Sequence, residues 1–433
     1  MFERIKAARK KSQGSTELKR LLIACDRLLG ESGESVSIAM AQDAIERFHQ
    51  LDGEHRRRFY KQLANRYNPD PQTILESAQA FAQSNSAQDL IHLVQVTEPP
   101  RQELFRRLNR ARNGTQTIVQ MRREIIAELK SDPDLAAVDA DLGHLLSSWF
   151  NPGFLQLDTI DWSSPALLLE QVIAHEAVHA IDGWNDLRRR LQPDRRLFAY
   201  FHPTLAGEPL IFVEVALLPE MPDAIAPLLD RGAEPDLDAR HYKVAAFYSI
   251  SNCQPGLKGI HLGNFLIKRV AEKLQDEFPS IKTFCTLSPI PTFAKFLKND
   301  PVWHPQRFTR SQIESLNTDH ATVRGWITSK DFDARTMRDA QQELMGRLCA
   351  AYLWQTSPNE AIHSDPVARF HLNNGAQLDR INARADLSAK GLRESFGYMV
   401  NYKYELNKIE SRHEDFVADT VAVSRGVKSQ INL

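Results

Sequence analysis

Residues 244–288 have the sequence VAAFYSISNCQPGLKGIHLGNFLIKRVAEKLQDEFPSIKTFCTLS, and this stretch decides the fold class. Its two ends, 244–251 and 281–288, are short apolar runs of the kind that form buried strands. Between them, 261–278 has the spacing of apolar and charged residues typical of an amphipathic helix. Strand, glycine-bearing loop, helix and strand make a βαβ unit, so we expect the two strands to be parallel neighbours in one sheet.

The rest of the C-terminal two thirds of the chain also has mixed α/β character. Residues 209–218 and 395–406 are further strand-like runs. Residues 299–365 return to helical and turn character, which predicts a helical insertion. The change from the preceding part of the chain comes at Asn151-Pro152-Gly153. We therefore expect a mixed α/β domain over residues 150–433.

The first 149 residues have the pattern of helices almost throughout. Apolar residues recur at spacings of three and four between Leu18 and Leu29, as on one face of a helix. Asp70-Pro71 has the pattern of an N-cap followed by proline at the first helical position. No paired chemical groups stand out in this region. We expect residues 1–149 to form an all-helical bundle that carries contacts between subunits rather than chemistry.

Composition excludes several classes of protein. The 54 Lys and Arg residues nearly balance 55 Asp and Glu residues, so charge supplies no reason to bind nucleic acid or an anionic membrane. Four widely spaced cysteines without a CxxC pair disfavour a disulfide scaffold and favour a reducing compartment. Charges interrupt the first 30 residues too often for a signal peptide, and Ile431-Asn432-Leu433 is not a peroxisomal address. We expect a cytoplasmic protein.

His175-Glu176-Ala177-Val178-His179 matches the HExxH pattern of zinc peptidases. Two histidines four residues apart would lie on one face of a helix and could hold zinc, with the glutamate as a base for bound water. However, position 182 is Asp where the extended motif has Gly, and no third histidine follows at the required spacing. A partly buried helix with capping or paired histidines explains the pattern better, so we expect no metal site.

The loop between the strand at 244–251 and the helix at 261–278 is a candidate phosphate-binding site. Its glycines would let the backbone approach a ligand, and the free N–H groups of the first helical turn attract phosphate. The loop lacks the GK[ST] of a Walker A loop and the GxGxxG of a dinucleotide site. Glycines that serve only the turn explain the spacing equally well.

Ser288 and His371 are candidate catalytic residues. Ser288 ends a predicted strand before Pro289-Ile290-Pro291, and the prolines would leave its hydroxyl at the carboxyl end of the strand, where α/β sheets bind ligands. A Ser-Pro turn that begins the next helix is an equal alternative. His371 lies near the end of a short helix that Asp365 would cap and Asn374-Gly375 would end. A structural charge at the helix end and an acid/base role both remain open for it.

Four segments together resemble the malonyl-CoA decarboxylase family: GEPLIFVEVAL (207–217), FYSISNCQPGLKGIHLGNFLIKRV (247–270), FPSIKTFCTLSPIPTF (278–293) and FHLNNGAQLDRIN (370–382). They occur in the family's order across most of residues 150–433. The resemblance implies a catalytic domain similar to the GNAT-type acetyltransferase fold, preceded by a helical oligomerisation domain. It also implies the conversion of malonyl-CoA to acetyl-CoA and CO2. The leucine-rich faces of the helical region suggest a homo-oligomer, such as a tetramer.

The resemblance further implies that Ser288 and His371 are the catalytic pair and that both contact malonyl-CoA. It implies that the pyrophosphate of coenzyme A binds to the loop after the strand, namely to Lys258, Gly259, Ile260, His261, Leu262, Gly263 and Asn264. His261 stands where other members carry an acidic residue or glycine, so the resemblance does not specify its contacts. EAVH recurs in the family without a zinc role, and no cofactor beyond the coenzyme A of the substrate is implied.

The implied chemistry suits these residues. Loss of CO2 from a malonyl thioester leaves an enolate, and each hydrogen-bond donor aimed at its oxygen contributes about 10²–10³ in rate. Histidine, with an ordinary pKa of about 6.5, can transfer a proton at neutral pH. We expect His371 to protonate C2 and Ser288 to orient the malonyl carboxylate or to relay the proton.

Other functions remain open from the residues alone. A CoA-dependent acyltransferase of the same fold would use acetyl-CoA and an amine acceptor. A zinc metallopeptidase would use residues 175–179. A CoA-binding regulator without catalysis would leave Ser288 and His371 without a purpose. The decarboxylase is the function we predict.

Overall fold

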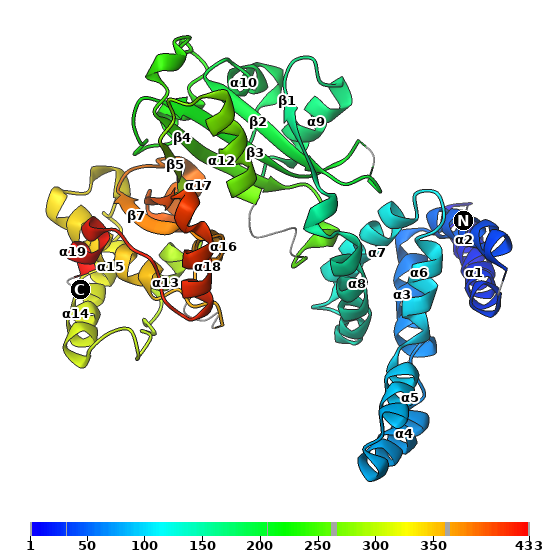
Figure 1. Cartoon of the computed structure of the whole chain (residues 1–433). Helices are drawn as coiled ribbons and strands as arrows, with labels where there is room; N and C mark the ends of the chain where they lie inside the picture. The colour runs from blue at the N-terminus through cyan, green and yellow to red at the C-terminus, as the bar shows by residue number, and fades with distance from the viewer. Residues whose placement is uncertain (1, 32, 206, 261–265, 360–363, 432–433) are drawn as a thin grey trace. The chain divides into compact units, whose positions relative to one another are not determined.

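The computed structural model describes residues 2–31, 33–205, 207–260, 266–359 and 364–431 (Figure 1). The chain divides into two compact units. The helical unit comprises Met1–Gln156, Phe201–Glu208 and Gln254–Leu262. The sheet unit comprises Leu157–Tyr200, Pro209–Cys253 and Gly263–Leu433.

Helices follow one another along nearly all of the first 149 residues, as predicted. They are α1 (Phe2–Gly30), α2 (Glu34–Gln50), α3 (Gly53–Arg66), α4 (Pro71–Ser84), α5 (Ala87–Thr97), α6 (Pro100–Leu108), α7 (Gly114–Glu128), η1 (Pro133–Leu135) and α8 (Ala136–Trp149), with η2 (Pro152–Phe154) after them. The carboxylate of Asp70 accepts the N–H groups of Gln72 and Thr73 and caps α4, which confirms the predicted start of that helix.

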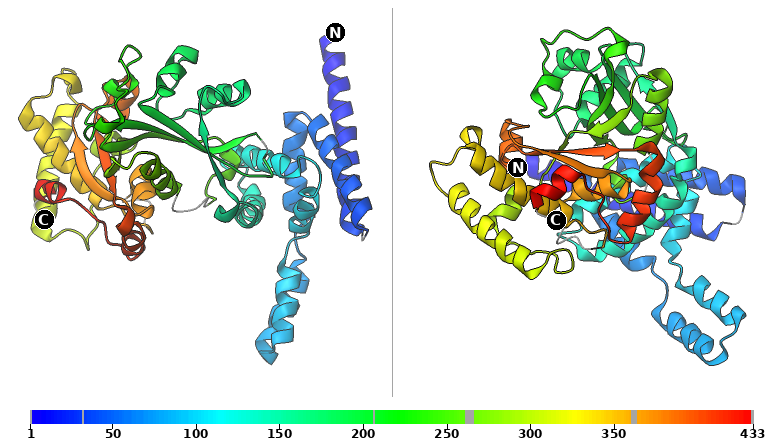
Figure 2. Two further views of the ribbon diagram at one scale, coloured as in Figure 1. Left: turned by 45° about the horizontal axis from the view of Figure 1, so that its top comes forward. Right: turned by 60° about the vertical axis from the view of Figure 1, so that its left-hand side comes forward.

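The helical unit has an uneven core. The apolar faces of α1, α2 and α8 are buried through side chains such as Leu28, Phe48 and Leu146. In contrast, α4 and α5 form a hairpin that extends away from the other helices of the unit (Figures 1 and 2), and α5 has no buried residue.

The sheet unit is built around a mixed, eight-stranded sheet. Its strands are β1 (Gln156–Ile160), β2 (Arg195–Phe201), β3 (Pro209–Leu218), β4 (Val244–Asn252), β5 (Thr283–Thr286), β6 (Ser288–Pro289), β7 (Gln377–Asn382) and β8 (Met399–Tyr404). The strand order is β1-β2-β3-β4-β5-β8-β6, and β7 also pairs with β8. A helical N-terminal region followed by this mixed sheet confirms the predicted fold class.

The predicted βαβ unit is present. β4 and β5 are parallel, with Val244 opposite Thr283 and Phe247 opposite Thr286. The described part of the connecting helix is α12 (Leu266–Glu277), which buries one apolar face that includes Val270 and Leu274. β3 is antiparallel to β4, and β8 is antiparallel to β5, β6 and β7.

The other helices of the described residues belong to the sheet unit, except η4, which belongs to the helical unit. They are α9 (Ala166–His175), α10 (Gly183–Arg190), α11 (Ala226–Leu229), η3 (Ala239–His241), η4 (Pro255–Leu257), α13 (Phe293–Lys298), α14 (Arg310–Ile327), η5 (Ala334–Thr336), α15 (Asp339–Trp354), α16 (Pro366–Asn373), α17 (Ala389–Ser395), η7 (Leu406–Lys408), α18 (Ile409–Val417) and α19 (Arg425–Ile431). α15 packs against both α14 and α19 (Figure 2). Residues 299–365 thus have the helical character that was predicted.

Three local expectations differ from the structure. The strand predicted over 281–288 is interrupted, because β5 ends at Thr286 and Ser288 begins β6 instead of ending the same strand. Strands β1, β2 and β7 were not predicted, because β2 and β7 carry charged residues and β1 is only five residues long. The helix expected across residues 175–179 is wrong, because α9 ends at His175 and the backbone of Glu176 is extended (φ −64°, ψ 110°).

The side chain of Glu176 explains why that helix stops. Its carboxylate accepts the N–H groups of Val178 (2.7 Å) and His179 (2.8 Å), which would otherwise bond to carbonyls of a continuing helix. The two histidines of HExxH therefore do not share a helix face. Among the described residues, no group of three or more His, Cys, Asp or Glu side chains is arranged to hold a metal ion. No helix of the described chain is long and apolar enough to cross a membrane.

Candidate active site

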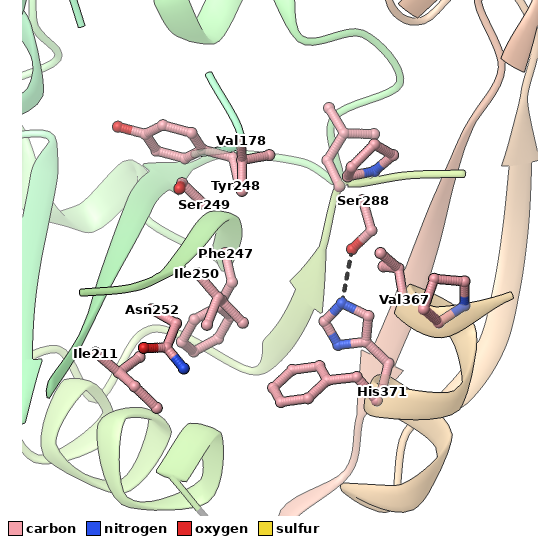
Figure 3. Close-up of a pocket in the computed structure, with 14 residues that line it drawn as sticks. Val178, Ile211, Phe247, Tyr248, Ser249, Ile250, Asn252, Ser288, Val367 and His371 are labelled. Atoms are coloured by element: carbon pink, nitrogen blue, oxygen red, sulfur yellow. Dashed lines mark hydrogen bonds between the residues drawn. The ribbon is translucent and has the colours of Figure 1, made fainter. Parts of the chain in front are cut away.

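A cavity of about 340 Å³ lies within the sheet unit, between β4 on one side and α16 with the start of β6 on the other (Figure 3). Most of its wall is apolar and includes Ile211, Phe247, Ile250, Leu287 and Phe370. Polar side chains in the wall are Tyr248, Ser249, Asn252, Ser288 and His371.

The structure brings Ser288 and His371 together. They are 83 residues apart in the sequence, and Ser288 Oγ lies 2.9 Å from His371 Nε2 (Figure 3). Ser288 begins β6, where it pairs with Val400 of β8. His371 occupies the last turn of α16, whose start is fixed by Asp365, since its carboxylate accepts two backbone N–H groups of the first turn. This confirms the predicted short helix.

Two tyrosines of β8 lie against the imidazole of His371. The hydroxyl of Tyr404 lies 2.8 Å from Nδ1, and the ring of Tyr402 stacks on the imidazole with 4.6 Å between centroids. The imidazole is only 4% exposed. This burial lowers the pKa of His371 to about 3, because the charged form is poorly solvated there. The imidazole of His371 is therefore neutral at pH 7.

The hydrogen bonds assign one tautomer to the neutral imidazole. Ser288 Oγ donates its single proton to Thr286 Oγ1 (2.8 Å), so it accepts a proton from His371 Nε2–H. Nδ1 then accepts the hydroxyl proton of Tyr404. Burial raises the pKa of Tyr404 well above its usual value of 10, which keeps that proton in place. A directed chain of donors runs from Tyr404 through His371 and Ser288 to Thr286.

The predicted coenzyme A loop is described only in part. Lys258, Gly259 and Ile260 follow η4 and belong to the helical unit. Gly259 has φ +79°, a conformation that glycine adopts without steric cost. His261, Leu262, Gly263 and Asn264 lie outside the described residues, so their part in the site stays a prediction.

Sequence reasoning missed the two tyrosines and the threonine around the pair. Tyr402 and Tyr404 were treated only as members of a strand, although their spacing of two residues places both on one face of β8. That spacing was the available signal. Thr286 lies two residues before Ser288, and its role depends on the hydroxyl distance, which no local pattern reveals.

Known proteins resemble this chain in sequence and in structure. The family model described as "Malonyl-CoA decarboxylase C-terminal domain" matches residues 153–433, and the one described as "Malonyl-CoA decarboxylase N-terminal domain" matches residues 67–150. This chain belongs to the malonyl-CoA decarboxylase family. The proteins named "Malonyl-CoA decarboxylase, mitochondrial" from Mus musculus and Anser anser anser are each 36% identical to it.

These matches cover most of this chain but less than two thirds of the length of each relative. The matches cover 70% and 72% of this chain, and they span 65% of the length of each relative. Crystal structures of malonyl-CoA decarboxylases from Rhodopseudomonas palustris and Agrobacterium vitis, each 42% identical, cover 95% of this chain and 99% of their own, with TM-scores of 0.83 and 0.81. The fold described above is therefore shared with the family over nearly the whole chain.

Proposed function

We propose that this protein converts malonyl-CoA to acetyl-CoA and CO2. The observation that carries the proposal is the buried hydrogen bond between Ser288 and His371, inside a cavity of a chain that belongs to the malonyl-CoA decarboxylase family. The names of the mouse and goose relatives support it, as does the likeness to bacterial structures of that name.

The wall of the cavity suits the loss of CO2. Decarboxylation breaks the bond between C2 and the carboxylate carbon, and its electron pair moves into the thioester carbonyl to form an enolate. None of the described residues that line the cavity is Lys or Arg. A carboxylate against the apolar part of this wall is poorly solvated and has no Lys or Arg among the described lining residues to pair with, whereas neutral CO2 is compatible with apolar side chains. Breaking the bond therefore relieves an unfavourable charge, provided that donors stabilise the enolate oxygen.

Ser288 and His371 provide the donor and the proton in this proposal. The hydroxyl of Ser288 turns from Thr286 to the substrate, where it orients the malonyl carboxylate or relays a proton. The negative charge of the bound malonyl group raises the pKa of the nearby imidazole, so the site takes up a proton together with its substrate. His371 then delivers that proton to C2. One proton is consumed per turnover, as the conversion of a carboxylate to CO2 and a methyl group requires.

We further propose that the reaction needs neither a metal nor an organic cofactor. The thioester carbonyl of the substrate accepts the electron pair, and coenzyme A enters as part of malonyl-CoA. The same carbonyl makes a separate electron sink unnecessary. Turnover is therefore expected to be insensitive to a chelator.

The decisive experiment measures CO2 and acetyl-CoA formed from malonyl-CoA, with and without EDTA. We expect wild-type turnover in both conditions, and a loss of about 10²-fold or more in Ser288→Ala and His371→Asn. Ser77→Ala, a buried serine of α4, is the control and should keep wild-type turnover. Absence of turnover in the wild type would refute the proposal, and acetyl transfer from acetyl-CoA to an amine would identify the acyltransferase instead. Loss of turnover with EDTA would refute the metal-free reaction.

For the coenzyme A end of the substrate we propose binding to Lys258, Gly259, Ile260, His261, Leu262, Gly263 and Asn264. The position of this loop between a strand and a helix supports the proposal, as does the positive φ of Gly259. Lys258→Ala should raise KM for malonyl-CoA about tenfold, because a charge-assisted contact to phosphate is lost. An unchanged KM would remove Lys258 from the site.

A homo-oligomer, such as a tetramer, is proposed to form through the helical unit. The α4–α5 hairpin supports this, because Leu75, Ile91 and Val94 are 52%, 59% and 61% exposed. Ile91→Lys with Val94→Lys should lower the mass measured by light scattering, whereas Gln95→Lys should not. A monomeric wild type would refute the proposal.

A cytoplasmic location is also proposed, supported by four free, buried cysteines.

A further inference from the structure

The segment after α9 borders the cavity through Val178, and the proposed reaction gives it no role. Residues 177–179, called the 177–179 turn below, have no regular secondary structure. All three of its N–H groups nevertheless bond to side chains. Ser251 Oγ accepts from Ala177 N (3.1 Å), and the Glu176 carboxylate accepts from Val178 N (2.7 Å) and His179 N (2.8 Å).

The three carbonyl groups of the turn are also bonded to side chains. Lys390 Nζ, from α17, donates to the carbonyls of Ala177 and Val178, both at 3.0 Å. Arg190, from α10, donates to the carbonyl of His179 at 2.8 Å. Every backbone polar group of the turn is thus bonded to a side chain, and these side chains come from four different places in the sheet unit.

Glu176 is itself held in place. Ser249 Oγ lies 2.8 and 2.7 Å from its two carboxylate oxygens, and Ser251 Oγ lies 3.1 Å from one of them. Both serines belong to β4, which forms one wall of the cavity. The backbone of the turn is therefore fixed relative to that wall. Such a degree of support is typical of a site whose geometry matters.

Val178 lies at one end of the cavity, next to Tyr248 (Figure 3). Asn252 and Ile211 lie at the other end, and the Ser288–His371 pair faces the space between. The chain continues from Asn252 into the proposed coenzyme A loop. We place the thioester of the substrate against the Ser288–His371 pair and its acyl group toward the Val178 end of the cavity, with the coenzyme A moiety on the side of Asn252. The β-branched side chain of Val178 has restricted rotamers, and on a fixed backbone it cannot move aside.

From this geometry we infer that Val178 is a specificity-determining residue, which limits the size of the group that C2 of the malonyl thioester can carry. Glu176 is the positioning residue that makes this limit sharp by fixing the 177–179 turn. The inference rests on the proposed decarboxylase function and deepens it. It assigns to the HEAVH segment a steric role in the acyl site.

The readout is the ratio of kcat/KM for each 2-methylmalonyl-CoA epimer to kcat/KM for malonyl-CoA. Val178→Ala should raise this ratio for one epimer by about tenfold or more, which is the usual effect of one methyl group in a fitted pocket. Glu176→Ala should also raise it, although its side chain does not line the cavity. Glu176→Gln should restore the wild-type ratio, because its amide oxygen can still accept the two N–H groups of the turn.

Val172→Ala is the matched control, since Val172 is a fully buried residue of α9 outside the cavity. It should leave the ratio unchanged even if it lowers the melting temperature. An unchanged ratio in folded Val178→Ala, or an equal rise in Val172→Ala, would overturn the inference about Val178. Wild-type turnover of malonyl-CoA would in that case still support the proposed function. Absence of that turnover in the wild type would overturn both.

Discussion

Replacing Tyr404 by phenylalanine tests whether the chain of hydrogen bonds at His371 sets the protonation of the site. The change removes the hydroxyl that donates to Nδ1 over 2.8 Å and keeps the aromatic ring. Nδ1 then becomes a buried acceptor without that donor, which costs about 1–3 kcal/mol. If this cost falls wholly on the tautomer that presents Nε2–H to Ser288, kcat for malonyl-CoA decreases about 5- to 150-fold and KM stays the same.

Tyr402→Phe is the matched control for this experiment. The ring of Tyr402 stacks on the same imidazole, but its buried hydroxyl has no hydrogen-bond partner within the described chain. Its kcat should remain within about twofold of wild type. Steady-state formation of acetyl-CoA and thermal unfolding of each variant provide the measurements. Wild-type kcat in a folded Tyr404→Phe protein, or an equal loss in both variants, would refute the reasoning.

Three further predictions concern stability. Burial lowers the pKa of His371 from 6.5 to about 3, so between these pH values the unfolded chain binds a proton that the folded protein does not. The free energy of unfolding therefore falls as the pH decreases from 6.5 toward 3. Denaturant titrations should show a shallower fall in His371→Gln. Gly256→Ala should lower the melting temperature, since a Cβ there would lie 2.1 Å from the carbonyl oxygen of Val119, whereas Gly325→Ala on the open face of α14 should raise stability by about 0.5–1 kcal/mol. Asp365→Ala should destabilise the protein by about 1 kcal/mol or more and lower kcat, because it uncaps the helix that carries His371.

The features predicted from sequence are those that depend on neighbouring residues. The βαβ pattern of 244–288 predicted the parallel pair of β4 and β5. Asp-Pro pairs at Asp70 and Asp365 predicted the starts of α4 and α16, because a side-chain cap and a fixed φ act within one helical turn. The resemblance to the family named Ser288 and His371, and the structure places them in one cavity.

The features that sequence reasoning missed depend on partners far along the chain. β7 has the sequence QLDRIN, whose alternation is weak, and it forms because β8 offers it a pairing edge. The HEAVH segment has a helical pattern, but the carboxylate of Glu176 accepts hydrogen bonds from two serines of β4 and from the backbone N–H groups of Val178 and His179. Hydrogen bonds to Ser249 and Ser251, which are distant in the sequence, thus override the local helical preference.

The sequence by itself determined the βαβ unit, the starts of α4 and α16 and the family, because these follow from periodicity, capping and matching segments. Only the tertiary structure decided the chemical state of the site. Burial among tyrosines of β8 lowers the pKa of His371, and the hydroxyl of Tyr404 selects its tautomer. A pKa and a tautomer depend on what surrounds a group in space, and residues 83 positions apart acquire a common environment only when the chain folds.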